Sequence, residues 1–229
     1  MPKYLNKEKN LFQESLDSFI YVDKSPLIEI LNKCIKTKQK YFCLCRPRRF
    51  GKSVTAQMLC SYYSRGEDSS SQFDSLKIAK STSYKKHLNQ YNVIFINMSL
   101  EFNSARHDVN QMISSITSSI VKELKEAYPQ VVFNSPDKLY ESLDDVFSVS
   151  KVPFVFIIDE WDRIMREKKE DAQSLKLYLE WLEGIFKDQS YIALAYMTGI
   201  LPIKKYGSHS ALNMFAEYSM TEPLNLGQY

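Results

Sequence analysis

The sequence lacks the features of several common protein classes. It has no run of about 18 apolar residues, the length that a membrane-spanning helix needs. Its polar start, from Lys3 to Lys9, has no signal-peptide pattern. The 30 basic residues are balanced by 27 acidic ones, so the net charge of +3 does not by itself indicate nucleic-acid binding. We expect a cytoplasmic protein with no membrane partner.

Cysteine and histidine are scarce, and neither has the spacing of a metal site. The four cysteines, at positions 34, 43, 45 and 60, form no Cys-x-x-Cys pair, and the three histidines are scattered. Cys43 and Cys45 would share one face of a buried strand. We therefore interpret the cysteines as small core residues in a reducing compartment, which excludes a disulfide framework and a zinc site.

Glycine is also scarce, with six in 229 residues, yet one of them belongs to a phosphate-binding motif. The apolar run Tyr41–Cys45 is typical of a buried strand. It leads into Arg46–Ser53, RPRRFGKS, which ends in the Gly-Lys-Ser of a phosphate loop. Gly51 lets the backbone approach a phosphate, and a helix starting near Lys52 would place its positive end below that phosphate.

The residue types of this loop indicate the roles of its side chains. Lys52 can place its ammonium on the β and γ oxygens of a nucleoside triphosphate, and the Ser53 hydroxyl can ligate the accompanying Mg²⁺. Arg46 stands where such a loop usually opens with glycine. Our candidates for nucleotide binding are Arg46, Pro47, Arg48, Arg49, Phe50, Gly51, Lys52, Ser53 and Val54.

A second motif, VPFVFIIDE at Val152–Glu160, is an apolar run closed by two acids. Asp159 at the end of a buried strand suits coordination of Mg²⁺ through water, and Glu160 suits orientation of an attacking water. Alternatively, the two acids merely end a strand and cap the next helix. The catalytic interpretation is favoured because loop and acid pair arrive in the expected order, each after an apolar strand.

These motifs resemble those of the AAA-ATPase-like family. The resemblance rests on RPRRFGKS, on Tyr21–Ser25 (YVDKS), on FIIDEWD and on Met197–Gly199, and it covers nearly the whole chain. The family consists of predicted P-loop ATPases, often fused to a C-terminal nuclease-like domain of the PD-(D/E)XK type. The resemblance implies MgATP as ligand, accounts for Arg46 at the loop opening, and implies a C-terminal domain that is missing after Tyr229.

Apolar strands alternate with helical patterns along the chain, which predicts an α/β P-loop NTPase of the ASCE or AAA-like kind. The sheet should be mostly parallel with helices on both faces. We expect one domain over 1–229, with 1–16 loosely attached. Expected strands are 19–22, 41–45, 91–98, 152–160, 191–197 and a short one within 210–218. Expected helices are 25–37 with Ser25 as N-cap, 53–65, 73–78, 84–89, 104–127 with Ser104 as N-cap, 137–147 and 173–186.

Thr198 is a further candidate for the site. In proteins with a catalytic Glu directly after the metal Asp, a strand carrying a polar sensor separates the acid-pair strand from the loop strand. By that analogy, Thr198 after the strand 191–197 would contact the γ-phosphate or the water. It can equally be a plain threonine at the end of a strand.

Three functions are compatible with the sequence. The first is an ATPase that drives or regulates an attached effector. The second is a nucleotide-binding module that does not hydrolyse, and the third is a nucleic-acid-binding component of a nuclease-linked system, using Arg46, Arg48, Arg49, Lys85 and Lys86. A homo-oligomer also remains open, because no arginine finger can be chosen among Arg106, Arg163 and Arg166. ATP turnover with and without DNA distinguishes the three.

Overall fold

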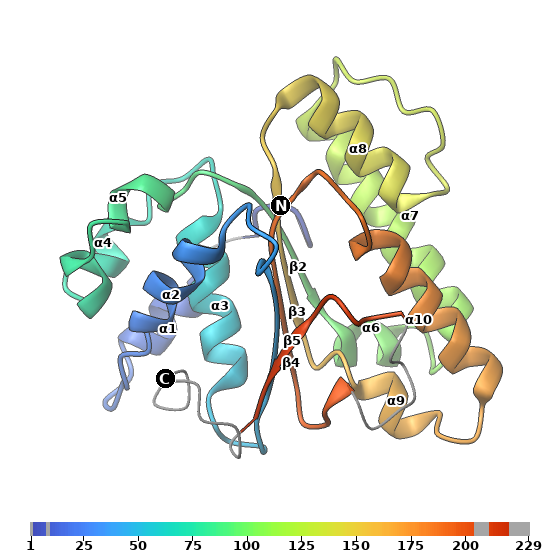
Figure 1. Cartoon of the computed structure of the whole chain (residues 1–229), viewed down its shortest axis with the longest axis horizontal. Coiled ribbons are helices and arrows are strands. Elements are labelled where there is room, and N and C mark those ends of the chain that lie inside the picture. The colour runs from blue at the N-terminus through green and yellow to red at the C-terminus, as the bar shows by residue number, and fades with distance from the viewer. Residues whose placement is uncertain (1, 8–9, 204–210, 220–229) are drawn as a thin grey trace.

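Five parallel strands form the sheet at the centre of the molecule (Figure 1). The computed structural model describes residues 2–7, 10–203 and 211–219. The strand order is β2-β3-β4-β1-β5. The strands are β1 (Tyr41–Cys45), β2 (Asn92–Asn97), β3 (Phe154–Asp159), β4 (Ile192–Gly199) and β5 (Ala216–Tyr218). The expected α/β fold with a parallel sheet is confirmed, and β4 lies between β1 and β3 as predicted.

Helices cover both faces of the sheet. One face carries α1 (Asn10–Leu16), α2 (Pro26–Cys34), α3 (Lys52–Tyr63), α4 (Ser70–Phe73), the 3₁₀ helix η1 (Lys77–Lys80) and α5 (Tyr84–His87). The other carries α6 (Met98–Ser104), α7 (Val109–Ala127), α8 (Leu139–Ser150), α9 (Arg163–Glu167) and α10 (Ala172–Phe186). Because both faces are covered, every residue of β1, β3 and β4 is buried.

Alternation along β1 divides its side chains between two hydrophobic cores. Cys43 and Cys45 enter the core that contains α7 and α10, whereas Phe42 and Leu44 enter the core that contains α3. The two thiols therefore share one face of a buried strand, as the sequence predicts, and their sulfur atoms are 3.9 Å apart.

The long apolar helix is shorter than predicted because a separate helix precedes it. Its apolar stripe is buried in the core as expected, but α7 begins at Val109, not after Ser104. The N-cap is Asp108, whose side chain accepts a hydrogen bond from the Gln111 amide at 2.9 Å. Ser104 instead ends α6.

The N-terminal residues are attached more firmly than the sequence indicates. Tyr4 and Leu5 are buried, and Leu5 forms an antiparallel bridge with Ile94 of β2. The Glu123 carboxylate of α7 accepts hydrogen bonds from the backbone amides of this segment, and Phe12 of α1 is buried against α3. The expectation of a loose segment over 1–16 is therefore wrong for the residues that the structure describes.

The segment 19–22 is not a strand, although its composition predicted one. Phe19, Ile20 and Val22 are exposed, Phe19 completely. The segment pairs with no strand in the described part of the chain, and composition cannot reveal that.

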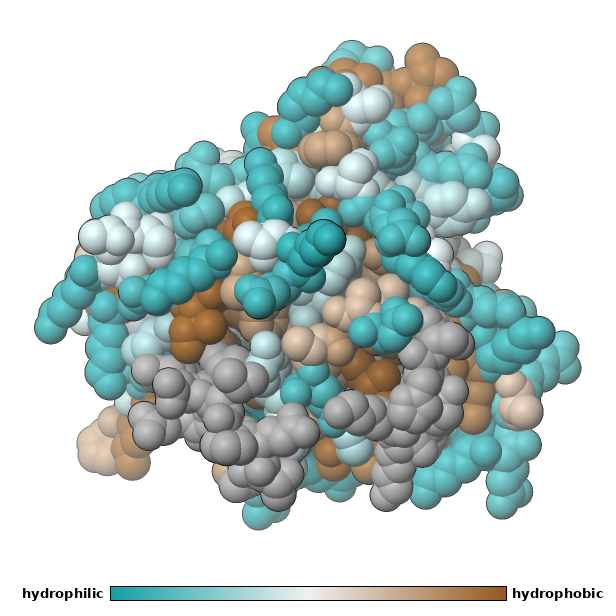
Figure 2. All heavy atoms as spheres, viewed as in Figure 1, coloured by the Kyte–Doolittle hydropathy of each residue, from teal (hydrophilic) through white to brown (hydrophobic). Residues whose placement is uncertain are grey.

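On the face shown in Figure 2, hydrophilic side chains predominate and hydrophobic ones form small, separate groups.

The start of α2 also differs in detail from the prediction. Ser25 makes no side-chain cap to its own helix. Its hydroxyl is buried and accepts a hydrogen bond from the Ile78 amide of η1 at 3.1 Å. Asp23 accepts from the Lys77 amide at 2.9 Å, so this segment is joined to a part of the chain more than 50 positions away.

Candidate nucleotide-binding site

The phosphate loop connects β1 to the first turn of α3. Gly51 is the N-cap of α3 and has a φ of 71°, in the left-handed region that glycine adopts without strain. Lys52 folds back over the loop, and its ammonium donates hydrogen bonds to the carbonyls of Arg46 at 3.0 Å and Pro47 at 2.8 Å. The loop is thus closed by its own lysine.

The surroundings of Lys52 show which charges lie near it. Burial lowers the pKa of Lys52 below its ordinary value, while the nearby carboxylates of Asp159 and Glu160 act in the opposite direction. The acid pair therefore lies within electrostatic range of the lysine. A loop at the end of β1 and acids at the end of β3 meet because both strands end on the same side of a parallel sheet.

Asp159 is almost fully buried at the end of β3 and is held by β4. Its Oδ1 accepts a hydrogen bond of 2.5 Å from the Thr198 hydroxyl, and the Thr198 oxygen also accepts from the Glu160 amide at 3.4 Å. Asp159 Oδ2 has no hydrogen-bond partner within the described ranges. A buried carboxylate oxygen without a partner is costly unless a cation or donor reaches it.

Glu160 departs from the strand geometry of β3. Its φ is 56°, a left-handed conformation that is uncommon for a residue with a side chain. Its carboxylate accepts a short hydrogen bond from the Ser99 hydroxyl of α6. Strained backbone of this kind is found disproportionately at functional sites. The Glu160 carboxylate is therefore held by a residue from a different strand connection, the one that follows β2.

Asp162 joins the acid-pair loop to the exit of β4. It is fully buried, and its Oδ2 accepts a hydrogen bond from Arg166 Nε at 3.0 Å. The same oxygen accepts from the backbone amides of Ile200 and Leu201, at 3.2 and 3.0 Å. This carboxylate therefore has a structural role, and Arg166 is occupied by it.

The other predicted arginines are dispersed. Arg46 is 6% exposed, and its Nη1 has no hydrogen-bond partner among the residues described. Arg48 and Arg49 are exposed on the loop, while Arg163 forms an ion pair of 2.6 Å with Glu167. Arg106 is exposed in the turn between α6 and α7.

The lysines proposed for a basic surface lie elsewhere. Lys85 and Lys86 belong to α5, which leads into the amino end of β2, whereas the loop follows the carboxyl end of β1 (Figure 1). Arg46 is buried, and Lys85 forms an ion pair with Asp74 at 3.2 Å. The five residues of that hypothesis therefore do not form one surface.

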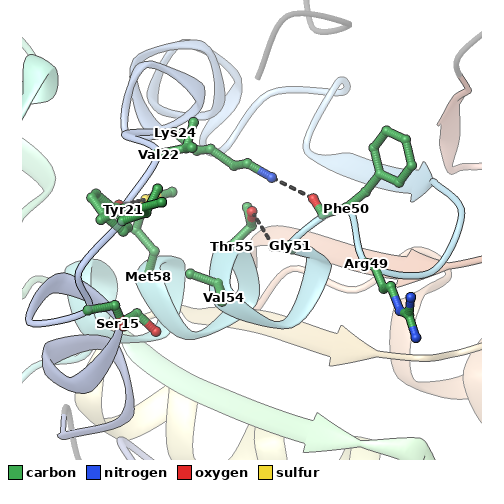
Figure 3. A pocket seen from close by; sticks show the side chains of 12 residues that line it. Ser15, Tyr21, Val22, Lys24, Arg49, Phe50, Gly51, Val54, Thr55 and Met58 are labelled. Carbon is green, nitrogen blue, oxygen red and sulfur yellow. Dashed lines mark hydrogen bonds between the residues drawn. The ribbon is translucent and has the colours of Figure 1, made fainter.

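A pocket of about 430 Å³ flanks the phosphate loop along α3 (Figure 3). One end is formed by the turn Phe50–Gly51 and the other by the segment before α2. Burial raises the pKa of Tyr21 to about 12, so this hydroxyl stays protonated. The lining residues are Ser15, Ser18, Ile20, Tyr21, Val22, Lys24, Arg49, Phe50, Gly51, Val54, Thr55 and Met58.

Comparison with known families gives a match that covers most of the chain. The profile of a family described as predicted AAA-ATPases, the AAA-ATPase-like family, matches residues 10–208. The chain belongs to this family. The AAA-ATPase-like resemblance of the motifs is thereby confirmed, and it identifies the chain in general terms as a predicted AAA-type ATPase and nucleotide-binding protein. No curated protein matches the chain. None of the described helices is both long and apolar enough to cross a membrane.

At the site of this AAA-ATPase-like protein, sequence reasoning assigned no role to Ser99 or Asp162 and left the role of Lys24 open. Ser99 holds Glu160, Asp162 holds the exit of β4, and Lys24 reaches the phosphate loop. The polar residues after β2 and the acid two residues after Glu160 were visible signals. Lys24 belongs to the YVDKS segment, which the family resemblance places near the base, with plain capping or surface charge as an equal alternative.

Gly199 provides a test of how tightly this end of the sheet is packed. A Cβ added at Gly199 would lie 2.6 Å from Trp161 Nε1 and 2.9 Å from Asp162 Oδ1, and both side chains are fully buried. We expect Gly199→Ala to destabilise the protein by about 1–3 kcal/mol, the usual cost of overpacking, as measured by urea unfolding.

Gly184→Ala is the matched control. Gly184 lies inside α10, and an added Cβ would be 3.7 Å from Tyr140 Cδ1, an ordinary contact. Replacing a helical glycine should stabilise the protein by about 0.5–1 kcal/mol. Equal effects of the two substitutions would contradict the packing described here.

Proposed function

We propose that this chain binds MgATP at Arg46–Ser53 and hydrolyses it with Asp159 and Glu160. The observation that carries the proposal is the hydrogen bonding of the buried Asp159 carboxylate. Its Oδ1 accepts from Thr198, whereas its Oδ2 has no hydrogen-bond partner among the residues that the structure describes. This group lies within electrostatic range of Lys52, at the amino end of α3. Family membership supports nucleotide binding in general.

The residues present suit a magnesium ion. Ser53 is exposed on the first turn of α3, and Asp159 supplies a free oxygen, the ligand type that Mg²⁺ prefers. Within the described ranges there is no group of three or more His, Cys, Asp or Glu side chains that could hold a metal. Magnesium is commonly bound by one or two protein groups together with phosphate oxygens and water. When bound, it neutralises charge on those phosphate oxygens.

The protein side chains then have separate roles in the proposed reaction. Lys52 leaves the loop carbonyls and binds the β and γ oxygens, and the amino end of α3 adds its positive dipole. Glu160, held by Ser99, orients the attacking water and accepts its proton. Thr198 keeps Asp159 in place through its hydrogen bond, and in the proposed complex it would contact the γ-phosphate or the water. The pocket beside α3 accommodates the base and ribose.

A nucleotide-binding protein that hydrolyses ATP slowly is the second candidate function. The ion pairs of its arginines favour this candidate. Of the three arginines considered for charge stabilisation, Arg163 and Arg166 are paired with Glu167 and Asp162. Supplying an arginine in trans raises the rate of related enzymes by about 10³–10⁵-fold. A chain that binds ATP well and turns it over slowly would regulate an attached effector, such as the nuclease-like domain found in the family, or act after self-association.

Removal of Lys52 tests the binding site. We expect Lys52→Ala to abolish MgATP binding measured by calorimetry, because the β and γ charges lose the loop ammonium. The matched control is Lys33→Ala on α2, an exposed lysine paired with Glu29 at 3.6 Å. Affinity like that of the wild type in a folded Lys52→Ala protein would disprove the phosphate-loop assignment.

Substitutions of the two acids should have different effects on nucleotide binding and on turnover. Glu160→Gln should keep nucleotide affinity and reduce phosphate release by roughly 10²–10⁴-fold, the range for a lost general base. Asp159→Asn, which still accepts the Thr198 hydrogen bond, should mainly weaken the Mg²⁺-dependent part of binding. Equal loss of binding in both folded variants would show that our division of roles is wrong.

A further inference from the structure

Lys24 reaches the phosphate loop from a different part of the chain. It lies just before α2, and its ammonium donates a hydrogen bond of 2.5 Å to the carbonyl of Phe50. A Cβ placed on Gly51 would be 2.8 Å from the same ammonium. Figure 3 shows the Lys24 side chain extended toward the carbonyl of Phe50, in the turn beside Gly51. Lys24 therefore lies directly over the glycine that admits a phosphate.

The charge of Lys24 is not neutralised by a nearby acid. No carboxylate forms an ion pair with it in the part of the chain that the structure describes. The adjacent Asp23 is already used, because its two oxygens accept from the amides of Ser25 and Lys77. Burial lowers the pKa of Lys24, and the neighbouring charges of Arg46 and Lys52 lower it further.

Three cations, Lys24, Arg46 and Lys52, therefore lie around one loop, and the carboxylates of Asp159 and Glu160 are within electrostatic range of Lys52. Such an arrangement is unfavourable while the site holds no anion, since like charges repel at short range. A polyphosphate would relieve this repulsion and accept hydrogen bonds from each cation.

We propose that Lys24 is a second lysine of the phosphate site, one that binds the polyphosphate of a nucleoside di- or triphosphate. The inference rests on the proposed function and adds a residue that the loop motif does not include. On binding, the ammonium leaves the Phe50 carbonyl for a phosphate oxygen, as Lys52 leaves Arg46 and Pro47.

The position of Lys24 identifies the phosphates that it meets. It lines the pocket beside α3 together with Gly51 and Thr55, whereas Asp159 and Glu160 lie on the Lys52 side. The base and ribose occupy that pocket in the proposed complex, so Lys24 contacts the α and β phosphates. Its contribution should therefore be the same for ADP and ATP.

The test is a comparison of nucleotide affinities in Lys24→Gln. Glutamine can still donate to Phe50 but carries no charge. Loss of one charged hydrogen bond to the polyphosphate should weaken the binding of ADP and of ATP by about 10–150-fold each, as measured by calorimetry. Lys24→Arg should recover most of this affinity. Lys33→Gln, the same charge change on the exposed surface of α2, should bind as the wild type does.

A second measurement uses the unmodified protein and does not depend on how the variant folds. ADP should protect Lys24 from an amine-reactive reagent, with Lys33 as the internal reference, as read by mass spectrometry. Wild-type affinity in Lys24→Gln, a loss for ATP alone, or equal labelling with and without ADP would each overturn the proposal. If Lys52→Ala loses binding while Lys24→Gln keeps it, only this inference fails. If the wild type binds neither nucleotide, the proposed function fails with it.

Discussion

The site depends on the common direction of the five strands in the sheet. Parallel strands end on the same side, so the connections after β1, β2, β3 and β4 are brought together there. The Thr198 hydroxyl is bonded to Asp159, 39 positions away, and the Ser99 hydroxyl to Glu160, 61 positions away. Because β4 lies between β1 and β3, Thr198 stands between the loop strand and the acid strand.

This end of the sheet has a positively charged half and a negatively charged half. Lys24, Arg46 and Lys52 surround the loop, and the carboxylates of Asp159 and Glu160 approach from the side of Lys52. Each half is costly alone, because its groups are partly or fully buried, and Asp159 Oδ2 and Arg46 Nη1 have no hydrogen-bond partner among the residues that the structure describes. In the proposed complex, an anion chelated to a divalent cation would satisfy both halves at once.

Local patterns predicted much of this structure. The strand, loop and helix over 41–63 and the strand that ends at Asp159 are contiguous motifs, with periodicity and residue types that are legible in the sequence. Contacts between distant segments were not predictable. The Ser25 hydroxyl serves Ile78 and not its own helix, Leu5 pairs with Ile94, and Lys24 reaches Phe50. The prediction also failed where two residues were equally good candidates for one role. Ser104 was predicted as the N-cap of α7, but Asp108 is the N-cap in the structure.

The most direct test of the account is the thermal stability of the wild-type chain with a series of nucleotides in Mg²⁺. A ligand at a hundred times its Kd that binds only the folded state adds about 2.7 kcal/mol of stability. For a protein of this size that corresponds to roughly 5–11 °C in Tm. We predict this rise with ATP and ADP, and its near absence with AMP and adenosine, because in the proposed complex the phosphate loop binds the β-phosphate. No shift with ATP, or an equal shift with AMP, would contradict the account.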